Sequence, residues 1–369
     1  MLSIGMAQQL CVLSGAGAAI YHSNVVANMV NAITEEQNPT SDPLDGVLFD
    51  VWEKEGAQES AIGVYYYDLN AQEIIPVLPE GYALQDVSPD QTLMLANQSE
   101  KLWLISLEDA TPQLICSSFS PADEGSGALF IDNESFVYLQ QQDNKTELIH
   151  LDINSKNKIR WLNGLALPFQ LLPGIENNIW VHLHPCESGI CTTDMEYWLV
   201  QDNIPQKLAV DAEQFWPATQ NNHIAFANPS INPNLVYFAD TLGFSSQQLR
   251  LAGSYTLDTR WHNDGREVAV LRLKRDFDTH KVTGIGQYLI DTKNLSVSEY
   301  APLNGLLGHA MWRDEDTLLV IFTQEKTRTF QLAIAETHLQ DRSVQQLSFE
   351  PAIQSDKMIY VRQFIGISE

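Results

Sequence analysis

One sequence pattern returns about every 40 to 50 residues along this chain and constrains its fold more than any other feature. A turn rich in Asp, Asn, Gly or Pro is followed by three short apolar strands separated by polar gaps. The clearest copy has its turn at 87–90 and its strands at 93–96, 102–107 and 113–116. Self-similarity at a fixed period predicts a repeat protein whose units bury their faces against their neighbours.

Six further segments show the same pattern. They begin near residues 47, 132, 173, 220, 261 and 312. Units of three or four short strands at this spacing are typical of β-propeller blades, whereas a pair of β-sandwiches would not repeat one turn motif seven times. We therefore predict an all-β fold with a single seven-bladed β-propeller at 41–369, with six or eight blades as alternatives. The tail 356–362 should add one strand to the first blade and close the ring.

The turns also carry a family resemblance. The turn Ser88-Pro89-Asp90 and its degenerate forms at 261–265 and 312–316 resemble the WD40-like (PD40) repeats of TolB-type propellers. The resemblance extends from about residue 45 to about residue 363 and implies a β-propeller. Propellers of this kind act as docking surfaces, sensor modules or parts of hydrolases, so the resemblance implies a fold and not a role.

The charge of the chain limits its partners. There are 47 acidic and 21 basic residues, which gives a formal net charge of −26. Such a chain repels phosphate backbones and anionic headgroups, so we expect no nucleic-acid partner and no anionic membrane surface. The sequence shows no transmembrane segment, since its apolar runs are too short to span a bilayer.

The N-terminal region and the cysteines favour an extracytoplasmic protein. Residues 1–40 are predicted to form an arm, and 1–7 are similar to the end of a secretion signal without its basic start. Cys186 and Cys191 bracket a turn, where we predict a disulfide, and such bonds persist in oxidising compartments. Cys11 and Cys116 could form a second pair. The expected location is the periplasm, the cell surface or the medium.

The densest group of chemically active side chains surrounds these cysteines. His182 and His184 lie on one face of a strand, and with Cys186 and Cys191 they could bind zinc or copper. Their spacing matches no familiar zinc motif, and Pro185 interrupts the strand. A disulfide with two histidines nearby is therefore the preferred interpretation, although a divalent metal remains an alternative and no other cofactor is expected.

Basic residues gather in the sixth repeat. Arg272, Lys274, Arg275 and Lys281 surround the predicted connection between two strands and could bind a carboxylate or an acidic partner. Asp276 and Asp278 are interleaved with them. The alternative is a solvated hairpin whose charges are paired locally.

No catalytic residues are predicted, because the sequence lacks the nucleophile-elbow, P-loop, dinucleotide and H-E-x-x-H motifs. Acidic residues recur at a similar place in four of the repeats, after the second predicted strand, where turn formation explains them better than catalysis does. These residues are Asp68, Asp152, Asp240 and Asp291. The sequence thus favours a noncatalytic exported scaffold that binds a protein or peptide. The alternative is a propeller hydrolase or lyase acting on a polysaccharide or small ester, and the oligomeric state is left open.

Overall fold

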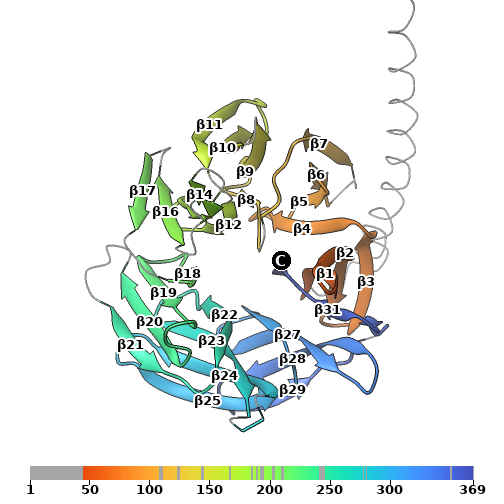
Figure 1. Ribbon diagram of the computed structural model, residues 1–369. Coiled ribbons are helices and arrows are strands. Elements are labelled where there is room, and N and C mark those ends of the chain that lie inside the picture. The colour runs from red at the N-terminus through yellow and green to blue at the C-terminus, as the bar shows by residue number, and fades with distance from the viewer. Residues whose placement is uncertain are drawn as a thin grey trace, which may run out of the picture.

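The computed structural model is a ring of seven antiparallel β-sheets (Figure 1). It describes residues 45–107, 111–122, 125–142, 145–165, 168–183, 186–187, 190–191, 195–201, 204–208, 212–240, 246–276, 278–279, 281–349 and 351–368. These ranges contain strands, turns and bends but no helix, and so no helix that could cross a membrane. The predicted arm of residues 1–40 lies outside them. The seven-bladed all-β prediction is confirmed.

Blades 2 to 7 each have four strands in sequence order from the centre outward, and blade 7 has a short fifth strand. Blade 2 consists of β4 (Tyr82–Val87), β5 (Leu93–Gln98), β6 (Lys101–Ser106) and β7 (Pro112–Cys116). Blade 3 consists of β8 (Ala128–Phe130), β9 (Ser135–Gln142), β10 (Lys145–Asp152) and β11 (Lys158–Leu165). Blade 4 consists of β12 (Pro168–Pro173), β13 (Ile179–Leu183), β16 (Glu196–Gln201) and β17 (Ile204–Leu208). A small hairpin, β14 (Cys186–Glu187) and β15 (Ile190–Cys191), lies between β13 and β16 in the chain.

The last three blades are formed by the second half of the chain. Blade 5 consists of β18 (Gln214–Pro217), β19 (His223–Ala227), β20 (Leu235–Asp240) and β21 (Gln247–Arg250). Blade 6 consists of β22 (Tyr255–Trp261), β23 (Glu267–Arg275), β24 (Val282–Asp291) and β25 (Ser296–Leu303). Blade 7 consists of β26 (Gly308–Trp312), β27 (Thr317–Glu325), β28 (Phe330–His338), β29 (Val344–Gln346) and the short β30 (Gln354–Ser355), which pairs with β28. The inner strands of successive blades contact one another around the ring.

Blade 1 closes the ring with strands from both ends of the described chain. β1 (Asp45–Glu55), β2 (Gln58–Asp68) and β3 (Glu73–Leu78) come from its beginning, and β31 (Met358–Tyr360) and β32 (Phe364–Ser368) come from its end. β32 pairs antiparallel with the first half of β1 and β31 with the second half. The predicted closure by the C-terminal strand is confirmed, and it covers the β1 edge that an open ring would leave unpaired.

The core lies between the blades, as the repeat pattern requires. One cluster joins Leu48 and Val64 of blade 1 to Leu84 and Met94 of blade 2, and Trp103 packs against it. Equivalent clusters fill the other interfaces, and Trp198 packs against the one between blades 3 and 4. Second strands such as β27 are buried along nearly their whole length, because both of their faces are covered by neighbouring blades.

The turns that open the repeats are stabilised by hydrogen bonds among their own residues. In the clearest copy, the Ser88 hydroxyl donates to Asp90 at 2.7 Å and accepts the backbone N–H of Leu93 at 2.9 Å. Asp90 also accepts the N–H of Thr92 at 3.2 Å. The pattern thus marks the turn between the first and second strands of a blade. The innermost strand precedes this turn and was not separated by the sequence pattern; these strands range from 3 residues in β8 to 7 residues in β22.

Candidate functional site

Hydrogen bonds between inner strands join neighbouring blades around the ring. The Gln85 side chain on β4 accepts the backbone N–H of Gly127 at 2.7 Å. Its neighbour Asp86 accepts the N–H of Phe130 at 2.7 Å. Burial raises the pKa of Asp86 to about 7, against the lowering effect of the backbone N–H groups of Phe130 and Val87. These polar groups serve the packing of blades 2 and 3.

A different group of charged side chains lies where blade 6 meets blade 7. Asp258 on β22 accepts the backbone N–H of Ala310 on β26 at 2.9 Å. The same oxygen accepts Nε of Arg260 at 3.0 Å and lies 3.5 Å from Nδ1 of His309. We call Asp258, Arg260 and His309 the inner-strand triad. It brings together Asp258 and His309, which are 51 positions apart in the chain, on the innermost strands of two neighbouring blades that contact each other.

The three side chains of the triad differ in exposure to solvent. The Asp258 side chain is 7% exposed, whereas that of Arg260 is 40% exposed and that of His309 is 29% exposed. Burial alone would raise the pKa of Asp258, but Arg260, His309 and the Ala310 N–H together hold it well below its usual range. Asp258 is therefore an ionised anchor that orients two basic side chains from adjacent blades.

Tryptophans extend this junction along the inner strands of blades 5 to 7. Trp261 Nε1 donates to the carbonyl of Trp216 at 3.0 Å, and Trp312 Nε1 donates to the carbonyl of Arg260 at 3.2 Å. His262 packs edge-on against Trp312 with ring centroids 4.7 Å apart. All three indoles are partly buried. Trp261 and Trp312 thus link the inner strands of neighbouring blades beside the triad.

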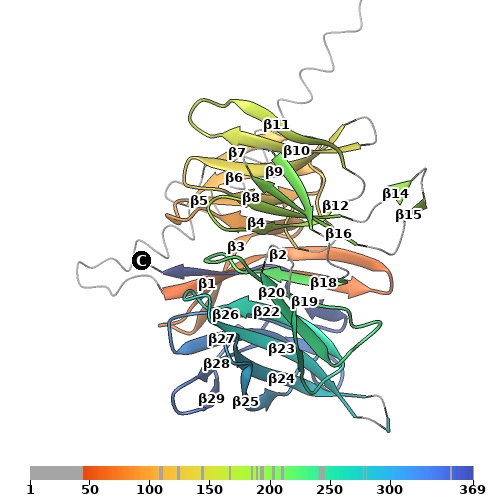
Figure 2. The same ribbon diagram turned by 90° about the vertical axis from the view of Figure 1, so that its left-hand side faces the viewer.

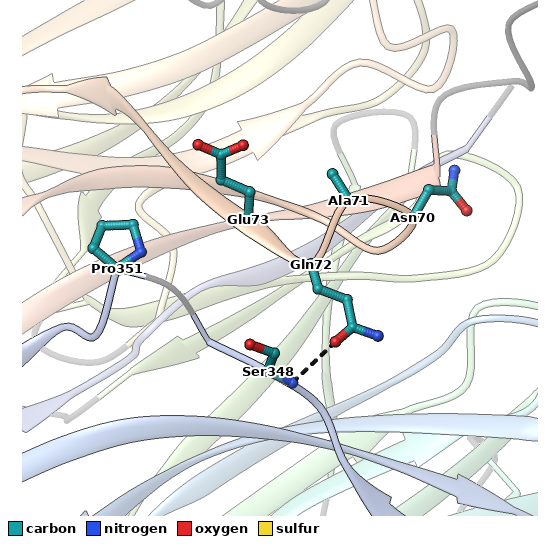
Figure 3. A pocket seen from close by; sticks show the side chains of 6 residues that line it. All are labelled: Asn70, Ala71, Gln72, Glu73, Ser348 and Pro351. Atoms are coloured by element: carbon teal, nitrogen blue, oxygen red, sulfur yellow. Dashed lines mark hydrogen bonds between the residues drawn. The ribbon is translucent and has the colours of Figure 1, made fainter.

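A shallow pocket of about 480 Å³ lies at the seam between the first and last blades. Its lining residues are Asn70, Ala71, Gln72, Glu73, Ser348 and Pro351 (Figure 3). Gln72 accepts the backbone N–H of Ser348 at 3.2 Å, and Tyr67 donates to the carbonyl of Ser348 at 2.6 Å. Glu73 is the one ionisable side chain among the six lining residues. The pocket is thus a feature of ring closure with little chemistry of its own.

Of the predicted metal ligands, His182 is the one whose side chain the structure describes. His182 is 1% exposed and stacks on Tyr197, with ring centroids 4.4 Å apart. Its Nε2 lies 2.7 Å from the sulfur of Met195, a residue that sequence reasoning did not single out. His184 lies outside the described residues, and among those described no group of three His, Cys, Asp or Glu could hold a metal ion. Binding of zinc or copper remains a prediction.

The predicted disulfide has a suitable backbone. In the β14–β15 hairpin, which projects from the ring (Figure 2), Cys186 lies directly opposite Cys191 in the strand register. The bond itself remains a prediction, because the two side chains lie outside what the structure describes. Cys116 is buried and free, and Cys11 lies outside the described residues.

The basic residues of blade 6 divide between the interior and the surface. Arg272 is 0% exposed and donates to the Thr256 hydroxyl at 3.2 Å, the Gly253 carbonyl at 3.1 Å and the Pro233 carbonyl. Lys274 forms an ion pair with Glu299 at 2.7 Å.

Arg275 and Lys281 are exposed at the end of the β23–β24 hairpin. Asp276, between them in sequence, accepts the N–H groups of Asp278 and Thr279. The structure therefore leaves two of the four predicted basic residues available to a partner, and their binding role remains a prediction.

The recurring acidic residues form turns, as predicted for them. Asp68 accepts the N–H groups of Asn70 and Ala71, both at 2.8 Å. Asp152 accepts Ser155 N–H at 2.7 Å, and Asp291 accepts Lys293 N–H at 2.8 Å. Asp240 ends β20 and is followed by residues outside the described ranges.

The fold is shared with several solved propellers. The β-propeller domain of the Trilobed protease from Pyrococcus furiosus is 13% identical, with a TM-score of 0.55 over 83% of this chain and 96% of that one. Apo AztD from Citrobacter koseri is 10% identical, with a TM-score of 0.52 over 88% of this chain and 99% of that one. The chain has the β-propeller fold. The Pyrococcus domain is described as having an open velcro topology, whereas here strands from both ends close blade 1.

TolB from Acinetobacter baumannii, the propeller type that the Ser-Pro-Asp turn resembles, is also among the similar structures. It is 13% identical, with a TM-score of 0.44 over 86% of this chain and 82% of that one. No protein-family model and no curated protein sequence matches the chain. These likenesses concern the fold, so the role of the chain must be argued from its own residues.

Proposed function

We propose that this chain is a noncatalytic, extracytoplasmic propeller that binds a protein or peptide at the centre of the ring, beside blades 6 and 7. The inner-strand triad is the observation that supports this role. Arg260 and His309 are partly exposed on innermost strands and are held in place by one buried carboxylate. Arginine and aromatic side chains on a rigid scaffold are the groups that most often carry binding energy in protein interfaces.

The rigidity of the ring favours binding over chemistry that needs moving loops. The first turns of the repeats are fixed by their own side chains, and the inner strands are joined across blades by hydrogen bonds such as that from Ala310 to Asp258. A preorganised surface loses little conformational entropy when a partner binds. Ring closure at blade 1 pairs the β1 edge with β31 and β32, so that edge is not available to a partner strand.

The test uses variants of the triad. Immobilised protein is exposed to a native envelope or culture-medium extract, and retained proteins are quantified for the wild type, Arg260→Ala and Arg266→Ala. Arg266 is an exposed arginine in the turn of the same blade and serves as the matched control. We expect a stoichiometric partner that Arg260→Ala loses and Arg266→Ala keeps. Equal retention by all three proteins contradicts docking at the triad.

The same geometry supports a second candidate function. An imidazole oriented by a buried carboxylate is the arrangement of a general base, so His309 with Asp258 could activate water in a hydrolase or lyase. The two candidates are separated by turnover of a panel of polysaccharides and small esters. Turnover that His309→Gln abolishes would favour the enzyme, and its absence together with a triad-dependent partner would favour the binding module.

A further inference from the structure

We propose that Arg260 and His309 form a binding site for a carboxylate, and that the ligand is the C-terminal carboxylate of a peptide chain. The peptide part of this inference rests on the proposed docking function. The carboxylate part rests on the geometry of the triad. It names the chemical group that the centre of the ring would recognise.

Arg260 keeps hydrogen-bond donors that are not engaged by the described residues. Its Nε is fixed by Asp258 at 3.0 Å, and within the described residues no hydrogen bond engages its two terminal nitrogens. By contrast, both terminal nitrogens of Arg313 pair with carboxylates, those of Glu336 and Asp45. A guanidinium whose Nε is held in place and whose terminal nitrogens are open can donate to the two oxygens of a second carboxylate.

The open edge of Arg260 suits a carboxylate. A planar guanidinium presents parallel N–H donors that match the two oxygens of a carboxylate. Nδ1 of His309 lies 3.5 Å from the same Asp258 oxygen that holds Arg260, so a second polar side chain, from blade 7, shares this anchor.

The position of the site favours a chain end over a side chain in the middle of a segment. β22 and β26 are innermost strands, and the inner strands of the other blades surround the same centre (Figure 1). A ligand that enters at the centre of the ring reaches these strands along the ring axis. A C-terminal carboxylate can be presented in this way by a single extended chain, whereas an internal Asp or Glu brings two flanking chain segments with it.

The experiment observes Arg260 directly. Protein labelled with ¹⁵N-arginine is titrated with N-acetyl-trialanine, which has a free C-terminal carboxylate, and with the C-terminal amide of the same peptide. The Arg260 Nε–H signal is identified by its loss in Arg260→Lys. We expect the free acid to shift this signal saturably and the amide to leave it in place. Binding measured by calorimetry should weaken at least tenfold in Arg260→Lys and several-fold in His309→Gln.

Matched controls make the result decisive. Arg266→Lys should bind the free acid like the wild type, and thermal melts should show that all variants are folded. Equal shifts with acid and amide, or unchanged binding by Arg260→Lys, overturn the site. A shift caused by inorganic phosphate but not by the free acid overturns the carboxylate assignment. An amidated peptide with an internal glutamate that binds as well as the free acid overturns the chain-end assignment.

The outcomes also separate this inference from the docking function. Free-acid binding at Arg260 without any protein partner from the extract supports the carboxylate site and contradicts protein docking. A partner that is lost in Arg260→Ala, combined with no response to the free acid, supports docking and contradicts the carboxylate site.

Discussion

The Asp50 carboxylate on β1 accepts the backbone N–H of Arg362 at 3.0 Å, which ties the C-terminal segment to the first strand of the described chain. It also accepts the N–H of Gln363 at 2.9 Å and the indole of Trp52 at 2.8 Å. The Arg362 guanidinium in turn stacks on Trp52, 3.8 Å from the ring centroid, and pairs with Glu59. One buried carboxylate therefore fixes the bend between β31 and β32 that ring closure requires.

Replacing Asp50 should weaken the closure. Asp50→Ala leaves the buried N–H groups of Arg362 and Gln363 without their acceptor, which costs about 2 to 4 kcal/mol of unfolding free energy. Asp50→Asn keeps one acceptor oxygen and should lose less. Urea unfolding measures the difference. Glu55→Ala is the control, because Glu55 is 71% exposed in its pair with Lys357 and should change stability by less than about 1 kcal/mol. Equal midpoints for Asp50→Ala and Glu55→Ala would show that Asp50 does not stabilise the closure.

Asp86 should make stability depend on pH. Its pKa of about 7 in the folded protein lies above the value for an unfolded chain, so protonation favours folding. The stabilising effect is complete below about pH 4 and is lost as the pH rises through about 7. The accessible surface of Asp86 shows that the residue is only partly buried. We therefore expect a loss of about 2 kcal/mol of unfolding free energy, less than the full pKa shift of Asp86 implies.

The measurement compares urea unfolding of the wild type and Asp86→Asn between pH 4 and pH 8. The asparagine retains an acceptor for the Phe130 N–H without titrating. The stability difference between the two proteins should therefore move in favour of Asp86→Asn as the pH rises. A difference that stays constant over this range would mean that Asp86 ionises at its ordinary pKa in the folded protein.

The fold was largely predictable because the repeat reports on each blade separately. Alternating apolar residues locate the strands, and turn residues such as Asp90 and Asp152 hydrogen-bond to atoms within a few positions. Ring closure was also predictable, because one C-terminal strand is left over when the repeats have been assigned, and the first blade is where it can pair. All of these features depend on residues that are near in sequence or on the period itself.

The triad was harder to predict because it depends on the alignment of one blade with the next. Asp258 and His309 lie close together because of how β22 and β26 are placed relative to each other. The spacing of residues within one repeat gives no information on that placement. The burial of Arg272 did leave a signal. It interrupts an apolar run from Val268 to Leu273 in a second strand, where both faces are covered by neighbouring blades. An arginine in such a run belongs to the interior.

Arg272 should matter far more for stability than its neighbour Lys274. Burial lowers the pKa of Arg272 to about 10, and the guanidinium is compensated by neutral oxygens of Pro233, Gly253 and Thr256. Arg272 bonds these acceptors through two separate nitrogens, Nη1 and Nη2, and the shorter Lys in Arg272→Lys has a single nitrogen that cannot span them, so we expect a loss of about 2 to 4 kcal/mol. Lys274→Ala removes an exposed ion pair and should cost less than about 1 kcal/mol. Thermal or urea unfolding tests the contrast, and similar losses for both variants would contradict it.

The β14–β15 hairpin should contain the predicted disulfide in protein isolated from its native compartment. Cys186 and Cys191 are opposite each other in the register, and a bond closing this short loop should stabilise the protein by about 2 kcal/mol. Mass spectrometry of alkylated, unreduced protein should find both cysteines protected, and Cys186→Ser should release Cys191 for labelling. Cys116 serves as the internal control, because it is free and should label only after unfolding.

The same preparation decides between the disulfide and the metal site, because thiols joined in a disulfide cannot bind a metal as thiolates. If the bond is present, elemental analysis of protein prepared without chelators should find no stoichiometric zinc or copper, and a chelator should leave the melting temperature unchanged. Two labelled thiols with one equivalent of metal, lost in His182→Ala, would reverse this interpretation. His182→Ala will also disturb the stack on Tyr197, so His182→Phe, which preserves an aromatic ring, is needed to separate metal loss from packing loss.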